Sequence, residues 1–144
     1  MARRSGSGPT AARTPRPTEA ELEILGILWK QGPSTVRAVH DAMAGSRPVG
    51  YTTVLKLLQI MAEKGLVRRD ETERAHVYAP SAPAERTQRR LVSDLLDRAF
   101  AGSAARLVQQ ALSSRRSSPE DIASIRRLLD DMEDDIRKER GDRS

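Results

Sequence analysis

The spacing of apolar residues changes once within the first 80 positions, and this change is what most constrains the fold. Between residues 18 and 64, apolar side chains recur every three or four positions in three short segments, which is the helical repeat. Between residues 66 and 78 the helical repeat stops, and two short strand-like runs, each with a Val, are separated by polar residues. The pattern therefore predicts three short helices followed by a β-hairpin.

Local signals mark the ends of the first two predicted helices. Thr18 and Glu21 have the spacing of a capping box, which indicates that the first helix begins there, and Gly32-Pro33 ends it. Ser34 is the expected N-cap of the second helix, because its hydroxyl can accept a hydrogen bond from the first helical turn. Residues 45–48, with the sequence Gly-Ser-Arg-Pro, break this second helix.

The third predicted helix spans residues 51–64, and Gly65 is its C-terminal stop. Two strand-like runs follow, at residues 66–69 and 75–78, joined by the polar segment 70–74 without a glycine. Three short helices and a hairpin in this order are typical of a winged helix-turn-helix. In such a domain one helix is placed in the DNA major groove. We assign this domain to residues 18–80.

Two groups of side chains are the candidates for DNA contacts. The third predicted helix opens with hydroxyl-bearing residues, which can bond base edges or phosphate where helical N–H groups point outward. The hairpin adds basic residues. Taken alone, each group is more often a solvated surface, but their combination with the element order favours DNA binding. The predicted contacts are Tyr51, Thr52, Thr53, Lys56, Arg68, Arg69, Arg74 and His76. Trp29 and Tyr78 are expected to be core residues.

Residues 81–139 are predicted to be a helical dimerisation region. Their apolar residues are too few for an independent core and lie along narrow helical stripes, so a second copy of the chain is the expected partner. The alternative is that these helices fold back on the winged domain. A strong helix start is expected at residues 118–121. The predicted dimerisation residues are Leu91, Leu95, Leu96, Phe100, Leu107, Val108, Ile122, Ile125, Leu129, Met132 and Ile136.

Composition excludes several classes of function. The net charge is +5, and residues 1–17 carry four arginines and no acid. This segment has too few large apolar residues to bury, so it is predicted to be a disordered tail, as are residues 140–144. The chain has no cysteine, no apolar run long enough to span a bilayer and no secretory signal, which favours the cytoplasm. His40 and His76 lack metal-site spacing, and no phosphate loop or nucleophile elbow is present. We predict no enzyme activity, cofactor, metal or small-molecule substrate.

Several segments, in this order, resemble the penicillinase-repressor (BlaI/MecI) family of bacterial winged-helix regulators over about residues 17–138. The segments are 17–25, Leu28-Trp29, 34–37, 50–55, Leu58-Gln59, 63–67 and 76–78. The resemblance implies a dimeric repressor that binds a dyad operator through its third helix and wing. Thr35 and Arg37, within the 34–37 segment, complete the predicted DNA-binding set.

The resemblance also implies a mode of release. In some members a membrane-bound metalloprotease sensor triggers cleavage of the repressor inside the dimerisation arm, and the equivalent bond here joins Gln110 to Ala111. Those members carry Asn-Phe at that bond. In this chain the segment from 111 to 117, which joins two predicted helices, is expected to be a loop. The absence of cysteine excludes the copper-sensing cysteine motif of another branch. A winged-helix adaptor that binds proteins without reading DNA sequence is the alternative function.

Overall fold

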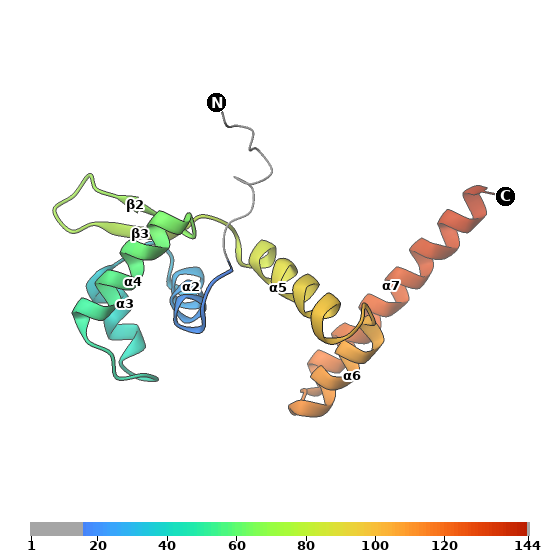
Figure 1. The fold of residues 1–144 in the computed structure, drawn as a ribbon. Helices are drawn as coiled ribbons and strands as arrows, with labels where there is room; N and C mark the ends of the chain where they lie inside the picture. The colour runs from blue at the N-terminus through green and yellow to red at the C-terminus, as the bar shows by residue number, and fades with distance from the viewer. Residues whose placement is uncertain (1–15, 144) are drawn as a thin grey trace. The chain divides into compact units, whose positions relative to one another are not determined.

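A computed structural model describes residues 16–143, which form helices and one small antiparallel sheet (Figure 1). The chain divides into two compact units between Ser93 and Asp94, inside α5. The fold class predicted from the sequence, mainly α with a small hairpin, is confirmed. The elements are α2 (Glu19–Gln31), β1 (Ser34–Thr35), α3 (Val36–Met43), α4 (Tyr51–Lys64), β2 (Val67–Asp70), β3 (Val77–Pro80), α5 (Ala84–Ala99), α6 (Ala104–Ser114) and α7 (Pro119–Arg143).

The capping box predicted for the first helix is present. Thr18 Oγ1 accepts a hydrogen bond from the Glu21 backbone N–H at 3.2 Å, and Glu21 Oε1 accepts one from the Thr18 N–H at 3.0 Å. These bonds satisfy two N–H groups that the start of the helix would otherwise leave unpaired. At the other end Gly32 takes a φ of 85°, a value that glycine adopts without strain, and α2 ends there.

The prediction that Ser34 caps the second helix is wrong by one residue. Thr35 is the N-cap of α3, and its Oγ1 accepts a hydrogen bond from the Ala38 N–H at 3.2 Å. Ser34 lies in β1, opposite Tyr78, and its hydroxyl donates to the Gly32 carbonyl at 2.8 Å. Backbone pairing in the sheet therefore holds Ser34 in an extended conformation, and the helix begins after it.

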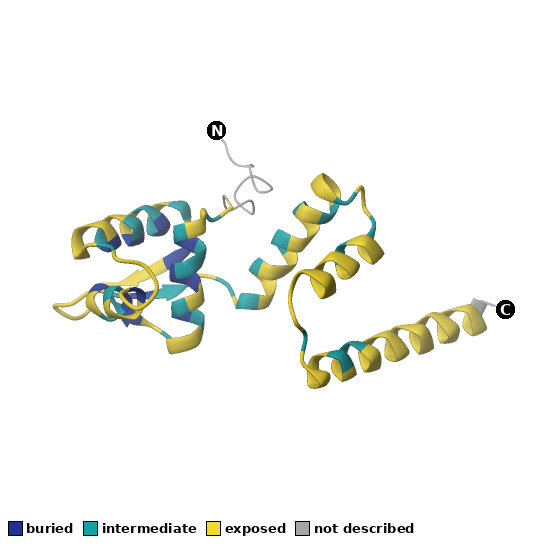
Figure 2. Ribbon diagram, turned by 90° about the horizontal axis from the view of Figure 1, so that it is seen from below, coloured by how far each residue is buried: buried dark blue, intermediate teal, exposed yellow. Residues whose placement is uncertain are grey.

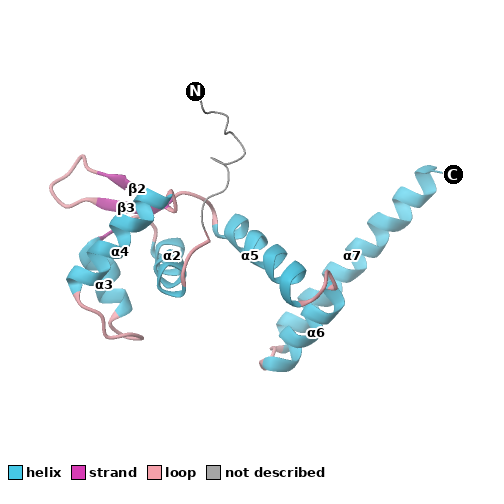
Figure 3. Cartoon of the chain, viewed as in Figure 1, coloured by secondary structure: helices cyan, strands magenta, loops and turns pink. Residues whose placement is uncertain are grey.

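The hairpin is part of a three-stranded sheet in the order β1-β3-β2 (Figure 3). The two-residue strand β1 was not predicted, because two residues are too short to show a period. Pro80, expected to end the hairpin, is the last residue of β3 and lies opposite Val67. Asp70 explains how the turn forms without glycine, since its Oδ1 accepts a hydrogen bond from the Thr72 N–H at 2.9 Å.

The core lies between α2, α3, α4 and the sheet, and Figure 2 shows buried residues on these elements. Tyr78 is 1% exposed, and Trp29 packs against the core while its Nε1–H donates to the Ala82 carbonyl at 3.0 Å. Both aromatic residues are therefore in the core region, as predicted. The buried apolar residues are Ile24, Leu25, Leu28, Val36, Val39, Met43, Val54, Leu58, Met61, Leu66, Val67 and Tyr78.

In the second unit, helices α6 and α7 follow α5, and serine caps begin both. Ser103 Oγ accepts from the Arg106 N–H at 3.2 Å, and Ser118 Oγ accepts from the Asp121 N–H at 3.0 Å. Neither α5 nor α6 contains a buried residue.

Two boundaries in the helical region differ from those expected from the sequence. The segment 111–117, expected to be a loop, is helical through Ser114, because α6 continues that far. Residues 140–143, expected to be disordered, continue α7, in which Arg137 is 3.6 Å from Asp134 one turn before this end. Ser144 and residues 1–15 of the predicted N-terminal tail lie outside the described residues.

Candidate nucleic-acid interface

A shallow concave surface of about 410 Å³ lies where the starts of α3 and α4 meet the wing, the hairpin of β2 and β3. Among the side chains that line it are five that the sequence predicted to contact DNA: Thr35, Arg37, Tyr51, Arg74 and His76. They come from three separate parts of the sequence. The fold therefore brings together two cationic residues, a titratable imidazole and two hydroxyl groups on one surface.

Two neighbours on α3 hold the Tyr51 ring in place. The Arg37 guanidinium carbon lies 5.8 Å from the ring centroid, within the range of a cation–π contact. The His40 ring meets Tyr51 edge-on, with centroids 6.1 Å apart. His40 Nε2 is also 2.9 Å from the Val49 carbonyl oxygen, which ties the segment before α4 to α3. Tyr51 is 45% exposed, so its outer part remains available to a ligand.

The first two turns of α4 present polar groups outward and apolar groups inward. Thr52, Thr53 and Lys56 are exposed, while Val54 and Leu58 are fully buried. The N-cap is Gly50, which provides no side-chain hydrogen bond to the turn. The first N–H groups of α4 therefore have no side-chain cap, and the positive end of the helix dipole favours an anion such as a phosphate there.

The four basic residues of the wing do not share one surface. Arg74 and His76 line the concave surface, whereas Arg69 lies opposite Tyr78 and borders a separate depression with Gln59, Ala62 and Glu63 of α4. Arg68 precedes Arg69 in β2. It is exposed and lies opposite Ala79 of β3. Because successive side chains of a strand point to opposite faces, Arg68 and Arg69 cannot face the same partner surface.

Acidic groups accompany the wing cations. Arg69 is 3.4 Å from Glu71, and His76 Nε2 is 3.8 Å from the other oxygen of the same carboxylate. A hydrogen bond with the Tyr78 side chain, and then the Glu71 charge, raise the pKa of Arg69. A hydrogen bond from the Thr72 backbone lowers the pKa of Asp70 at the turn. Arg74 forms no ion pair with the residues that the structure describes, so its charge is less compensated than that of Arg69.

A buried ion pair fixes α4 relative to α2, and the sequence did not indicate it. Glu21 is 2% exposed, and Lys64 Nζ donates to both of its carboxylate oxygens, at 2.8 and 3.0 Å. Burial acts to raise the pKa of Glu21, but the hydrogen bonds from Lys64 and Thr18 outweigh it, and the pKa lies below its usual value. The two residues are 43 positions apart, and only the capping role of Glu21 was visible in the sequence.

The predicted dimerisation residues are all unburied in the single chain. Leu129, Met132 and Ile136 of α7 are each more than half exposed, and Leu95 and Val108 are almost half exposed. The others, which are partly exposed, are Leu91, Leu96, Phe100, Leu107, Ile122 and Ile125. The structure adds exposed apolar residues that the predicted set left out, namely Val92, Leu112 and Leu128. Helical periodicity in the surrounding sequence could have found all three.

The proposed cleavage position has a different local structure from the one expected. Gln110 and Ala111 are both exposed, and both lie within α6. An extended conformation at this bond would require the C-terminal part of α6 to unwind. The neighbouring arginines, Arg115 and Arg116, lie beyond the helix and are exposed.

Among residues 16–143, no helix is long and apolar enough to cross a membrane, and no cluster of acidic residues and histidines has the make-up of a metal site. Three helices and a hairpin, with exposed polar residues at the start of the third helix, define a winged helix-turn-helix protein. The family model described as "Penicillinase repressor" matches residues 17–131, and the chain belongs to this family of transcriptional repressors.

Known proteins match most of the chain. It is 32% identical over 123 residues to "Transcriptional regulator BlaI" of Mycobacterium tuberculosis, covering 85% of this chain and 88% of the relative. It is 21% identical over 119 residues to "Penicillinase repressor" of Bacillus licheniformis, covering 83% and 93%.

Two solved structures are similar to part of the chain. The DNA-binding domain of the repressor BlaI matches with 22% identity and a TM-score of 0.46, covering 50% of this chain and 88% of that one. The monomeric Bacillus licheniformis BlaI in complex with the blaP half-operator matches with 22% identity and a TM-score of 0.45, covering 51% and 89%.

Proposed function

We propose that this chain is a sequence-specific DNA-binding repressor of transcription that acts as a homodimer on a dyad operator. The observation that carries the proposal is the concave surface at the start of α4, where Arg37, Tyr51, Arg74 and His76 come together beside exposed Thr52 and Thr53. Cations and an uncapped helix N-terminus suit phosphate, and hydroxyl and methyl groups suit base edges.

The two kinds of contact have different effects on affinity. Arg37, Arg74 and Lys56 would neutralise phosphates and set the register of the protein on the duplex, with little dependence on sequence. Thr52 and Thr53, on the exposed side of α4, would enter the major groove and discriminate between bases. The Arg37 and His40 contacts that hold Tyr51 would keep its hydroxyl in a fixed position for a phosphate.

Dimer formation is supported by the exposed apolar residues of the second unit. Four large apolar side chains of α7, at positions 128, 129, 132 and 136, are each more than half exposed. Positions 129, 132 and 136 follow one another at steps of three and four residues, and 128 lies four residues before 132, so the set forms a stripe along the helix that a second copy of the same helix can cover. Two recognition helices would then read half-sites one helical turn apart, about 34–36 Å, or a multiple of that distance.

The relatives support repression as the outcome of binding, since one is named a penicillinase repressor and another a transcriptional regulator. A dimer bound across a dyad can exclude other proteins from the promoter.

The deciding experiment is selection and sequencing of DNA bound by the purified full-length chain, followed by gel shifts at a stated salt concentration. The DNA upstream of the chain's own gene competes against a shuffled duplex of equal length and composition. We expect recovery of a dyad and preference for the upstream DNA. Equal binding to both duplexes would contradict sequence-specific repression and favour a winged-helix adaptor that binds proteins.

For release from DNA, the proposal includes proteolysis in the second unit, at or near the Gln110–Ala111 bond, by a protease activated through a membrane metalloprotease sensor. Support comes from exposure and from the absence of buried residues in α6, because a helix with few buried contacts opens locally at low cost. Mass spectrometry of the chain during induction tests this part. A promoter that is derepressed while the chain remains intact would contradict it.

A further inference from the structure

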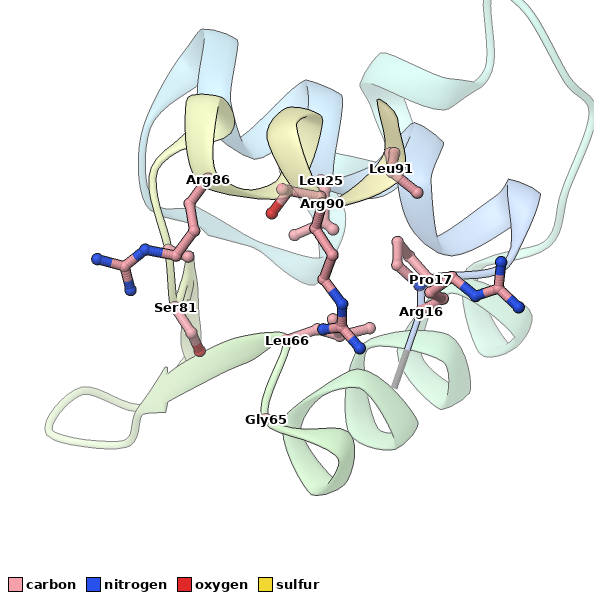
Figure 4. A pocket seen from close by; sticks show the side chains of 11 residues that line it. Arg16, Pro17, Leu25, Gly65, Leu66, Ser81, Arg86, Arg90 and Leu91 are labelled. Atoms are coloured by element: carbon pink, nitrogen blue, oxygen red, sulfur yellow. The ribbon is translucent and has the colours of Figure 1, made fainter. Parts of the chain in front are cut away.

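A second cavity, of about 290 Å³, lies at the other end of α4 from the concave surface (Figure 4). The C-terminal end of α4, the segment between β3 and α5, one residue of α2 and the first turns of α5 line it. All of these residues belong to the first compact unit. Its volume is near the lower end of the range for small-molecule sites, roughly 300–1,000 Å³.

The floor of the cavity is apolar and held in place. Leu25 is 2% exposed and Leu66 is 9% exposed, and both line the cavity. The Ser81 N–H donates to the Leu66 carbonyl at 3.0 Å, and Trp29 Nε1–H donates to the Ala82 carbonyl at 3.0 Å. Because these bonds fix the segment between β3 and α5 to the residue before β2 and to α2, the cavity is formed before any ligand binds.

The rim of the cavity is cationic. Arg16, Arg86 and Arg90 line it, and none of the described residues that line it is acidic. In Figure 4 the Arg90 side chain extends across the cavity to Leu66 and Arg16 lies by Pro17, whereas the Arg86 guanidinium near Ser81 points away from the other labelled residues. Within residues 16–142, neither Arg86 nor Arg90 forms an ion pair.

Arg86 and Arg90 are four residues apart on α5, so they lie on one face of the helix, one turn apart. A planar guanidinium matches a carboxylate in geometry and can bond both of its oxygens. The apolar floor requires a ligand body without charge, since a charged group there would lose its hydration without a partner.

We propose that this cavity binds a small organic monocarboxylate with an apolar body about the size of one aromatic ring. The body packs on Leu25 and Leu66, the carboxylate bonds Arg90, and Arg86 at the rim adds positive charge that favours the anion. Residues 1–15 of the chain carry three arginines and no acid, so their charge does not complement the cavity. The site is separate from the proposed DNA surface, because the 14 residues of α4 place its two ends about 21 Å apart. It does not depend on the proposed function.

The chain reports on this site through its own fluorescence, because Trp29 is its single tryptophan and is hydrogen-bonded to a residue of the cavity wall. Benzoate is the probe, and it is titrated against the full-length chain without DNA, by calorimetry and by Trp29 emission. Benzamide has the same shape without the charge, and inorganic phosphate has the charge without the apolar body. We expect saturable binding of benzoate, with both controls weaker by about tenfold or more.

The variant Arg86→Gln/Arg90→Gln removes both charges, and Arg89→Gln is the matched control, because Arg89 is exposed on the same helix and does not line the cavity. We expect the double variant to lose about tenfold or more in benzoate affinity and Arg89→Gln to keep it. Circular dichroism and thermal unfolding check that each variant is folded. Binding of benzamide or phosphate equal to that of benzoate, or equal losses in both variants, would overturn the proposal, as would no saturable benzoate binding.

Discussion

At the start of α4, the side chain of Tyr51 is held by contacts with neighbouring residues, whereas the side chains of the two threonines that follow it are not. Tyr51 contacts both Arg37 and His40, whereas Thr52 and Thr53 are exposed, and within the described residues their hydroxyls form no hydrogen bond. The free hydroxyls are therefore the groups whose loss should change binding without changing the fold.

Thr53→Ala should weaken binding to the selected operator by about tenfold, because a good base contact contributes roughly 1–3 kcal/mol of discrimination. Binding to shuffled DNA should stay the same. Fluorescence anisotropy with labelled duplexes measures both affinities. Thr87→Ala is the control, since Thr87 lies on α5 and does not line the concave surface. Unchanged operator affinity in Thr53→Ala would remove this residue from the base-reading set.

Arg74→Gln should lower the affinity for operator and shuffled DNA alike and reduce the salt dependence of binding by about one ion. Arg69→Gln should have a smaller effect, because Glu71 already compensates the Arg69 cation at 3.4 Å and strand alternation separates it from Arg68. Affinity measured over a series of salt concentrations tests both variants. A larger loss in Arg69→Gln than in Arg74→Gln would mean that the wing meets DNA through its other surface.

At the scale of elements, the Glu21–Lys64 pair connects the first turn of α2 to the last turn of α4. Lys64→Met should lower the free energy of unfolding by roughly 3 kcal/mol, because it leaves the buried Glu21 carboxylate without its cation. This value is the low end of the usual range, since Lys64 is 29% exposed. Urea unfolding measures the change.

Two further variants isolate the cause of that loss. Glu21→Leu/Lys64→Met should recover most of the stability, because neither charge is then buried alone. Lys56→Met, on the exposed side of the same helix, should change stability little. If Lys56→Met were as unstable as Lys64→Met, loss of a lysine from α4, and not loss of the buried pair, would be the cause.

The same pair makes stability depend on pH. The pKa of Glu21 is lower in the folded chain than in the unfolded chain, so its contribution is complete above the unfolded value of about 4.3 and is lost as the pH falls through the folded value. In Glu21→Gln this part of the acid dependence should disappear. Thermal unfolding of both proteins from neutral to acidic pH measures the difference, and parallel curves would contradict the assignment.

The elements were predictable from the sequence where their signals are local. The Thr18 capping box, the Gly65 stop and the serine caps at Ser103 and Ser118 each depend on residues within four positions, and the structure contains them all. Strand β1 depends on pairing with Tyr78, over 40 positions away, and this long-range pairing also moved the α3 cap to Thr35. Strand alternation alone separates Arg68 from Arg69, but the position of Arg69 opposite Tyr78 depends on the long-range register of β2 with β3.

For the whole molecule, the proposed dimer depends on the exposed apolar stripe of α7. Met132→Lys should dissociate the proposed dimer, because the charge would be buried in the interface without a partner. Sedimentation equilibrium measures the assembly, and gel shifts should show a change from dyad to half-site binding. Ser124→Lys, at an exposed polar position of the same helix, should leave the assembly unchanged. A Met132→Lys chain that stays dimeric would exclude this stripe as the interface.

Thr35 shows how the fold restricts the evolution of operator preference. Its hydroxyl caps α3, its backbone pairs with Val77 in the sheet, and its side chain lines the concave surface. A replacement must keep a capping oxygen, which leaves Ser, Asp and Asn, and a carboxylate there would repel phosphate. Thr52 and Thr53 are under no such combined demand. Relatives that diverge to recognise new operators should therefore vary at positions 52 and 53 while retaining Thr or Ser at position 35.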